Sequence, residues 1–441
     1  MTTPLRRAAG FAVVGTLALG APALGRAAAV PFVLVAALAA FVVDEGPFFE
    51  LFALPGDERA GRLRGLAGFA LAAAGLALLA SISRSRVTMP LSVFVAAVLI
   101  VAYGNLGARL VESTASDPFG PVAGYVVAAF LAATGGQVAV VASTGGGTVA
   151  ALPRVAFLAA VGALVAGLLH ALLYVRDDPV VILSVGFLLW LFEAIAGPVT
   201  PVEVGAALGI TVVLGYVSYA LGTASVPGML TGVLLGLLTV VLGGFGWFAV
   251  LIAFFAVGGL SAKYRYEEKR VRGVAEDDEG ARGTGNVLGN ATVALVAVIG
   301  FAAVPVLPVG AAVFRFAFAG SLAAAMSDTL SSEIGGLFDD PRLITSLERV
   351  DPGTDGGVTW QGGIAGLAGA ALVAAVATLL FPPTAGLATV GVVAVAGVVG
   401  MLVDSVLGAT VEGGRVGNQT VNFLATLTGA AVCVALALVL L

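Results

Sequence analysis

Charged residues, cysteine and histidine are scarce in this chain. Charged side chains make up 11% of the 441 residues, against about 25% in an average soluble domain. Cys433 is the only cysteine, which excludes an intrachain disulfide and a cysteine-based zinc site. His170 is the only histidine and lies far in sequence from every polar cluster. We therefore interpret it as a helix-packing residue, and any chemistry falls to carboxylates, hydroxyls, basic side chains, backbone amides and a hard metal ion.

Apolar residues and glycine fill most of the chain. Hydrophobic residues make up 59% of it, with 61 glycines, and the mean hydropathy is +1.08. Repeated apolar runs approach or exceed the ~20 residues that a helix needs to cross a bilayer, and glycine lets helices pack closely in lipid. We predict an all-α polytopic membrane protein with roughly a dozen transmembrane helices in one bundle, surrounded by membrane lipids. No nucleic-acid partner is expected.

The expected spans divide the chain into residues 1–196, a transmembrane region of unassigned role, and residues 197–441. An apolar helix pair is expected before Val43, interrupted at Arg26. Glycine clusters predict breaks at Gly135-Gly136 and Gly145-Gly146-Gly147 and a hairpin turn at Gly243-Gly244. The other spans are expected at about 65–82, 87–104, 120–150, 155–174, 179–196, 203–221, 225–260, 286–307, 309–326, 363–381, 384–403 and 420–441.

Polar residues concentrate in the stretch from Ser327 to Gly362, between apolar spans. Unpaired charge close to lipid is costly, so the stretch is a functional-site hypothesis. On an unbroken helix Asp328 shares a face with Ser332, and Thr329 shares one with Glu333. Asp328 and Glu333 are five residues apart. Either they serve different partners, or the helix ends around Ser331 and the following glycines bring Glu333 inward.

A glycine-rich segment follows, from Asp351 to Gly363. The pairs Pro352-Gly353 and Gly356-Gly357 predict turns whose backbone N–H groups point outward, a geometry that binds phosphate. Asp355 could hold a metal ion, and Thr354 or Thr359 could donate a hydrogen bond to a phosphoryl oxygen. The helix expected downstream presents an N-terminus, which also favours anions.

A third polar island runs from Val403 to Phe423. Asp404 and Ser405 close one span, while Asn418 and Asn422 open the next on one helix face. The pattern Asp-Ser-x-x-Gly, which ends at Gly408, echoes the Ser327–Gly335 segment. We therefore expect two equivalent helix ends to meet at one site.

The longest basic loop runs from Ser261 to Asn286. Cytoplasmic loops collect Lys and Arg, so we place it in the cytosol. Lys269 and Arg282 suit a polyphosphate, and Asn290 lies just inside the next span. For most residues of the loop, a solvated segment that sets the topology is the better interpretation.

These motifs in combination resemble the transmembrane protein 19/phytyl-phosphate kinase family of integral membrane proteins. The resemblance covers residues of about 200–441 and rests on SDTLSSEIG, PRLITSLERVDPGTDGGVTWQGGIAG, DSVLGAT, the two asparagines of α-helical spacing after it, and the segment from the paired Phe254-Phe255 to Asn290. The glycine-rich RGTGN before Asn290 departs from the more polar lead-in expected there.

The resemblance implies phosphorylation of a prenyl monophosphate of phytyl or geranylgeranyl type to the diphosphate by a nucleoside triphosphate. Similarity to polyprenol kinases and CDP-diacylglycerol synthases implies CTP and Mg²⁺. The implied catalytic and metal-binding residues are Asp328, Glu333 and Asp404. The candidate substrate- and nucleotide-binding residues, some from the resemblance and some from the patterns above, are Thr329, Ser332, Gly353, Thr354, Asp355, Gly356, Gly357, Thr359, Ser405, Gly408, Asn418, Asn422, Asn290, Lys269 and Arg282.

Two other functions stay open at this point. A cytidylyltransferase would use the same metal and CTP but release pyrophosphate and leave a CDP-lipid. A secondary transporter would place carboxylates near the bilayer midplane at broken helices. The carboxylates here lie at predicted span ends, which favours an enzyme whose site faces the cytosol from the cell membrane. The Ser261–Gly285, Gly335–Gly362 and Val411–Gly417 segments are then all expected on the cytosolic side.

Overall fold

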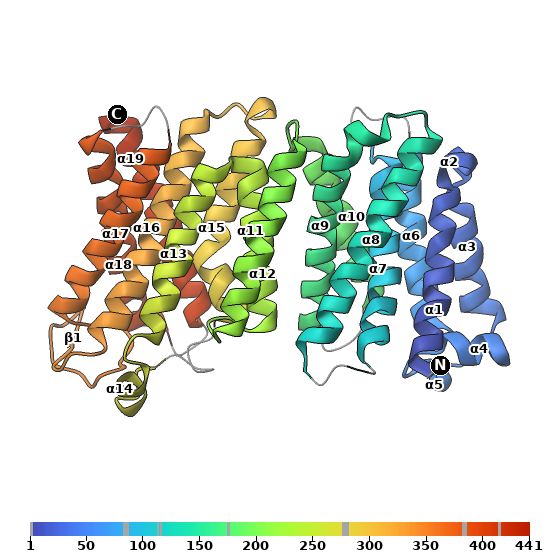
Figure 1. Ribbon diagram of the computed structural model, residues 1–441. Helices are drawn as coiled ribbons and strands as arrows, with labels where there is room; N and C mark the ends of the chain where they lie inside the picture. The colour runs from blue at the N-terminus through green and yellow to red at the C-terminus, as the bar shows by residue number, and fades with distance from the viewer. Residues whose placement is uncertain are drawn as a thin grey trace. The chain divides into compact units, whose positions relative to one another are not determined.

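The computed structural model describes residues 3–82, 88–112, 114, 117–173, 177–275, 282–381, 386–412 and 416–441. Parts of two segments predicted to face the cytosol, 276–281 and 413–415, lie outside these ranges. Across the described residues, thirteen helical segments are long and apolar enough to cross a membrane. This confirms the prediction of an all-α polytopic membrane protein (Figure 1).

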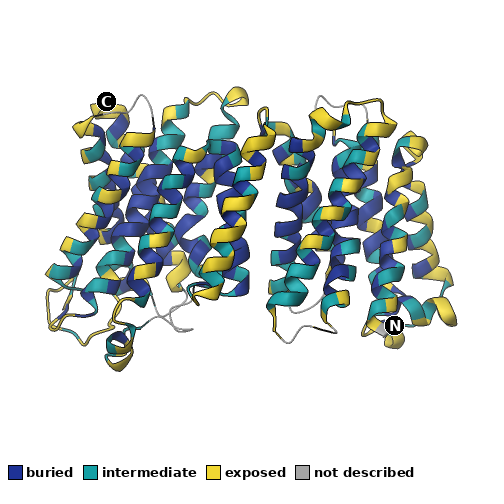
Figure 2. Ribbon diagram, in the orientation of Figure 1, coloured by how far each residue is buried: buried dark blue, intermediate teal, exposed yellow. Residues whose placement is uncertain are grey.

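The chain forms two compact units, Met1–Val204 and Gly205–Leu441, where one bundle was expected. The boundary falls within the helix α11 (Pro201–Ala220). In both units, buried side chains line the middle of the helices and exposed ones gather at the ends and outer faces (Figure 2). Large apolar side chains on the outer faces, such as Leu379 at 82% exposure, are what a bilayer would cover.

The first unit contains short helices near its start and then five long ones. Its elements are α1 (Thr3–Thr16), η1 (Leu17–Gly20), α2 (Ala21–Leu24), η2 (Gly25–Ala27), α3 (Val30–Ala37), η3 (Leu38–Val42), α4 (Pro47–Phe52), α5 (Asp57–Ala60), α6 (Arg64–Ser81), α7 (Leu91–Glu112), α8 (Phe119–Ser143), α9 (Thr148–Leu172) and α10 (Asp178–Ile195).

Glycine in α8 serves helix packing. The helix continues through Gly135-Gly136, so the break predicted there is wrong. Gly136 lies against Leu99 and Val95 of α7, where a larger residue would not fit. The break predicted at Gly145-Gly146-Gly147 is confirmed, because α8 ends at Ser143 and Gly145 has a φ of 79°, which suits a glycine.

Polar side chains inside the first unit pair with one another. The Asn105 side-chain amide donates to Asp178 Oδ1 at 3.1 Å, and both residues are buried. His170 stacks on Tyr125, with ring centroids 4.7 Å apart, which fits the helix-packing role predicted for it.

The second unit contains the polar clusters. Its elements after α11 are α12 (Val226–Leu238), η4 (Thr239–Gly243), α13 (Phe245–Lys263), α14 (Tyr266–Val271), α15 (Thr284–Ala302), η6 (Val304–Val306), α16 (Ala311–Gly335), β1 (Arg342–Leu343), β2 (Gly357–Val358), α17 (Trp360–Leu380), α18 (Leu387–Val411) and α19 (Asn418–Leu440). The strands β1 and β2 pair antiparallel. The predicted hairpin turn is confirmed at Gly244, whose φ is 97°.

Helix α16 lies at the centre of the second unit and packs against α13, α15, α17, α18 and α19. It is not one of the thirteen apolar segments, and it carries Arg315 near its start and polar residues after Met326. Close approach to α19 requires small residues: Gly320 lies against Gly429 and Cys433. The helix continues past Ser331 to Gly335. Of the two alternatives for Asp328 and Glu333, the structure therefore favours different partners.

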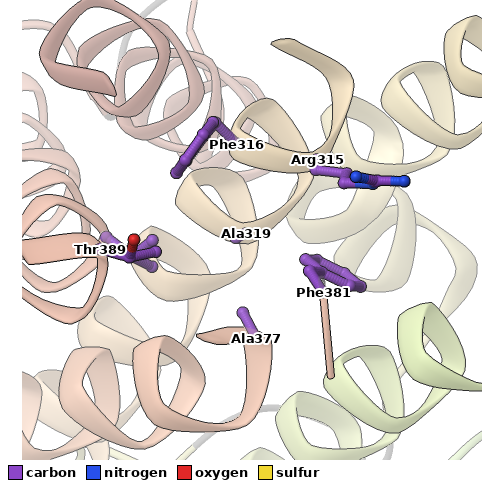
Figure 3. A pocket seen from close by; sticks show the side chains of 7 residues that line it. Arg315, Phe316, Ala319, Ala377, Phe381 and Thr389 are labelled. Atoms are coloured by element: carbon purple, nitrogen blue, oxygen red, sulfur yellow. The ribbon is translucent and has the colours of Figure 1, made fainter. Parts of the chain in front are cut away.

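A small cavity lies at the apolar end of α16. This cavity, lined by Arg315, Phe316 and Phe381 among others, has a volume of about 10 Å³ (Figure 3), which is close to the space of one water molecule. Arg315 is thirteen residues before Asp328, or about 20 Å along a helix. The candidate site is at the other end.

Candidate functional site

One end of the second unit gathers the polar residues. The helices α16 and α18 finish there and α17 and α19 begin there, while α14 and the β1–β2 segment cover the same end (Figure 1). The three polar clusters of the sequence, although separated by long apolar spans, therefore meet in space.

Asp328 of α16 and Asp404 of α18 form the centre of this end. Their side chains are in hydrogen-bond contact, as expected for two helix ends that meet at one site. Among the described residues, Asp404 Oδ1 is also buried without a hydrogen-bond partner. Two bare carboxylates in contact repel each other, so the pair needs a proton or a cation between them.

The glycine-rich loop sits directly on α18 beside this pair. Gly356 has a φ of 73°, and a Cβ atom on it would lie 2.6 Å from the Ser405 carbonyl oxygen. A Cβ atom on Gly408 would in turn lie 3.0 Å from the Gly356 nitrogen. The loop and the helix thus touch backbone to backbone, which only glycine allows. This contact brings Asp355, Gly356, Ser405 and Gly408 together.

Glu412 is a site residue that the sequence reasoning missed. It follows α18 directly, its carboxylate interacts with Asp355, and it is hydrogen-bonded to the Asn418 side chain. Burial, and then the neighbouring Asp355, raise the pKa of Glu412 above its ordinary value, while the Asn418 hydrogen bond opposes the rise. Glu412 is the one acidic residue between Asp404 and Asn418 in the sequence, so no acidic cluster marks it there.

Helix α19 contributes both predicted asparagines. The Asn422 side-chain amide donates to Asn418 Oδ1 at 3.1 Å, so the two lie on one face as expected. Through Asn418 this face connects to Glu412 and hence to the loop. The first turn of α19 is therefore part of the site.

Glu333 and Lys269 form a buried ion pair with each other. The Lys269 ammonium group donates to Glu333 and to the carbonyl oxygens of Ser261, at 3.0 Å, and Ala262, at 2.7 Å. All three N–H donors of the lysine are thus used. Lys269 links α14 to the end of α13 and to α16. The nucleotide contact of Lys269 and the metal-binding role of Glu333 stay predictions. Five residues along a helix turn Glu333 away from Asp328.

Arg282 and Asn290 are also buried inside the unit. The Arg282 guanidinium lies over the Phe254 ring, 5.4 Å from its centroid, and against Gly258 of α13. The contact of Arg282 with a polyphosphate stays a prediction. The Asn290 side chain donates to the Asn286 carbonyl oxygen within α15.

The remaining predicted residues shape the backbone around the site. Thr359 caps α17 by accepting from the Gly362 N–H at 3.1 Å, and its hydroxyl donates to the Gly335 carbonyl oxygen at 3.4 Å. Thr354 closes the turn after Gly353, whose φ of 85° confirms the predicted turn, by donating to the Asp351 carbonyl oxygen. Gly357 pairs with Leu343 in the β1–β2 ladder. Ser332 donates to the carbonyl oxygens of Asp328 and Thr329 on the last turns of α16.

The donor set suits a hard cation. Mg²⁺ is usually held by one or two carboxylates together with substrate phosphates and water. Asp328 and Asp404 supply such a pair, and the buried, unsatisfied Asp404 Oδ1 is the atom that a cation would satisfy. No group of three or more His, Cys, Asp or Glu residues suited to a metal occurs among the residues that the structure describes.

Comparison with protein families identifies the family to which residues of the second unit belong. Residues 209–430 match the family described as integral membrane protein DUF92, over half of the chain. The chain belongs to this family. This confirms the predicted resemblance at the level of a family of integral membrane proteins.

Individual relatives match less than half of the chain. An uncharacterised membrane protein of Methanocaldococcus jannaschii is 35% identical over 216 residues, covering 46% of this chain and 81% of the relative. Protein VTE6, chloroplastic, of Arabidopsis thaliana is 32% identical over 43% of this chain and 56% of its own length. An uncharacterised membrane protein of Synechocystis is 31% identical, covering 43% of this chain and 74% of the relative. No solved structure matches the chain significantly.

Proposed function

We propose that this member of the DUF92 family is a membrane-embedded prenyl-phosphate kinase. It would convert an isoprenoid monophosphate of phytyl or geranylgeranyl type to the diphosphate, with a nucleoside triphosphate, CTP by the sequence resemblance, as donor. The observation that carries the proposal is the meeting of Asp328 and Asp404 beside the glycine-rich loop. That arrangement offers carboxylates and backbone amides to two phosphorylated substrates at the end of a membrane helix bundle.

Phosphoryl transfer asks the protein mainly for positioning and charge neutralisation. An oxygen of the lipid monophosphate forms a bond to the γ-phosphorus of the donor, the bond from that phosphorus to the β–γ bridging oxygen breaks, and the nucleoside diphosphate leaves. The attacking oxygen is already anionic, so a strong general base is not required. This matches a site built from carboxylates, asparagines and backbone groups.

Asp328 and Asp404 would hold Mg²⁺, which supplies charge neutralisation on the donor phosphates. Asn418 and Asn422, in the first two turns of α19, offer amide groups to a phosphate, and the helix N-terminus adds its backbone N–H groups. Gly356 and Gly408 keep the loop pressed on α18, so that Asp355 and Glu412 flank the same space.

The donor nucleotide implies that this end of the unit faces the cytosol. Arg265, Lys269, Arg270 and Arg272 lie in or beside α14 at the same end, and basic segments stay on the cytoplasmic side. Single cysteines at Glu267 and Ser346, introduced with Cys433→Ser, should react with impermeant reagents from the cytosolic side. Reaction of Ser346→Cys only from outside would contradict the proposal.

One assay separates the proposed kinase from its alternatives. Purified protein would be incubated with labelled CTP, ATP or UTP, Mg²⁺ and a panel of prenyl monophosphates, and the products resolved by mass. A prenyl diphosphate with a nucleoside diphosphate supports the kinase. A CDP-lipid with pyrophosphate identifies a cytidylyltransferase. Absence of nucleotide consumption with every substrate would overturn the enzyme, and transport in proteoliposomes would then be measured.

A further inference from the structure

A groove between α15 and α19 is not accounted for by the phosphate chemistry. Its volume is about 310 Å³, at the lower end of the ~300–1,000 Å³ of typical ligand sites. Leu288, Gly289 and Thr292 line one side, and Gln419, Thr420 and Phe423 line the other.

The groove begins at the polar end of the unit. Gly285 and Gly289, in the first turns of α15, both lie against Gln419, the second residue of α19. The two helix N-termini are therefore neighbours at the same end. The glycines bring the helices together at Gln419, and the residues next to them line an open groove beside this contact.

On the α19 side, the lining changes from polar to apolar along the groove. Gln419 and Thr420 lie in the first turn of α19, while Phe423 lies one turn deeper. On α15, Leu288 is followed by Thr292, whose hydroxyl donates to the Leu288 carbonyl oxygen at 2.6 Å. That hydroxyl is spent within its own helix, so the deeper part of the groove presents mainly carbon. Such a gradient fits an amphiphile with its head at the membrane surface.

Helix α19 is a wall shared by the groove and the proposed phosphate site. Gln419 and Phe423 face the groove, while Asn418 and Asn422 lie one position round the helix, toward Glu412. A molecule whose chain occupies the groove thus has its head group at the first turn of α19, beside the carboxylates and the loop.

We infer that the groove between α15 and α19 binds the isoprenoid chain of the phosphorylated lipid, and that the lipid enters it sideways from the bilayer. The inference rests on the proposed function for the identity of the head group. The apolar lining selects a hydrocarbon chain, and the helix N-terminus at the mouth selects an anionic head.

Photo-crosslinking tests the groove without requiring turnover. A geranylgeranyl monophosphate analogue with a diazirine on its chain would be added to the full-length protein in nanodiscs, and labelled peptides identified by mass. We expect labelling at Leu288, Thr292 or Phe423 that unlabelled geranylgeranyl monophosphate competes away. Labelling elsewhere, or labelling at the groove that excess phosphatidylcholine removes equally well, overturns the inference.

Filling the groove tests its role in substrate choice. Thr292→Phe should lower kcat/KM for geranylgeranyl monophosphate about tenfold more than for dimethylallyl monophosphate, because only the longer chain reaches Thr292. Val395→Phe, at a 52% exposed position on α18, is the matched control and should alter neither value. Equal losses for both substrates would contradict the inference. If Thr292→Phe does not fold, Phe423→Ala, which removes part of the wall, should weaken competition by the unlabelled lipid.

The outcomes for the groove and for the kinase are distinguishable. If the groove is labelled in a protein that consumes no nucleotide, the groove binds the lipid phosphate and the proposed kinase activity is wrong. If the protein forms prenyl diphosphate but is labelled only outside α15 and α19, the kinase proposal holds and the groove is not the lipid site.

Discussion

The buried pair of Lys269 and Glu333 permits a direct test of whether Lys269 supports the fold or binds the nucleotide. Lys269 is 1% exposed and Glu333 is 6% exposed. Removing one partner of a buried ion pair typically costs about 3–5 kcal/mol, because the other charge stays buried and uncompensated. Lys269→Met should therefore destabilise the protein by that amount. With 2–4 °C per kcal/mol, the apparent unfolding temperature should fall by about 10 °C.

The partner variants sharpen this prediction. Glu333→Gln should cost less, since the glutamine oxygen still accepts from Lys269 and both carbonyl contacts remain. The double variant Lys269→Met/Glu333→Leu should recover much of the loss, because no isolated charge is left buried. The carbonyl oxygens of Ser261 and Ala262 would still lose their donor, so recovery should be incomplete.

The assay compares thermal unfolding in detergent with nucleotide kinetics below the unfolding range. For Lys269→Met we expect a lower unfolding temperature with an unchanged KM for the nucleotide. A KM raised tenfold or more at an unchanged unfolding temperature would refute the structural role and restore Lys269 as a nucleotide ligand. Arg270→Met, at an exposed position in the same helix, is the control and should alter neither quantity.

Three further changes have defined outcomes. Gly356→Ala should lower kcat and reduce the free energy of unfolding by about 1–2 kcal/mol or more, because Gly356 has a positive φ and lies against Ser405. The control Gly363→Ala, at a position with open space around it, should change neither the activity nor the unfolding temperature. The pKa of Glu412 is raised, so the folded state favours the protonated carboxyl. The stability that Glu412 contributes is therefore fully present below the ordinary pKa of 4.5 and is lost as the pH rises through the raised pKa. Glu412→Gln should remove this pH dependence of the unfolding free energy, and an unchanged pH profile would contradict the assignment. Asn105→Ala should cost about 1–3 kcal/mol by leaving Asp178 short of a donor, while kcat per folded molecule stays unchanged; lost turnover without lost stability would instead place Asn105 in a site.

Much of the helical arrangement could be predicted from hydropathy. The expected spans 179–196 and 420–441 correspond to α10 and α19 within a few residues, because long apolar runs in a membrane have few alternatives to helix. Glycine was less informative. The pair Gly243-Gly244 does end a helix, whereas Gly135-Gly136 lies inside one. The difference depends on packing against α7, which local sequence does not contain.

The candidate site was predicted in its residues more than in its contacts. The echo between Asp328 and Asp404 correctly indicated two helix ends that meet. Lys269 and Glu333 are 64 residues apart in sequence, so only the tertiary fold shows that each neutralises the other. Glu412 was overlooked because it stands alone after α18, and its importance appears only when the loop brings Asp355 beside it.

The most direct test of the central claim is a double-mutant cycle on the two aspartates. Asp328→Asn and Asp404→Asn are nearly isosteric and each removes one carboxylate from the proposed Mg²⁺ site. Each should reduce kcat for prenyl diphosphate formation about 10²-fold or more. The double variant should be little worse than either single one, because residues that act as a unit fail together. Asp339→Asn, at an exposed position paired with Arg272, should retain full activity. Full turnover by Asp404→Asn alongside an inactive Asp328→Asn would contradict the shared site.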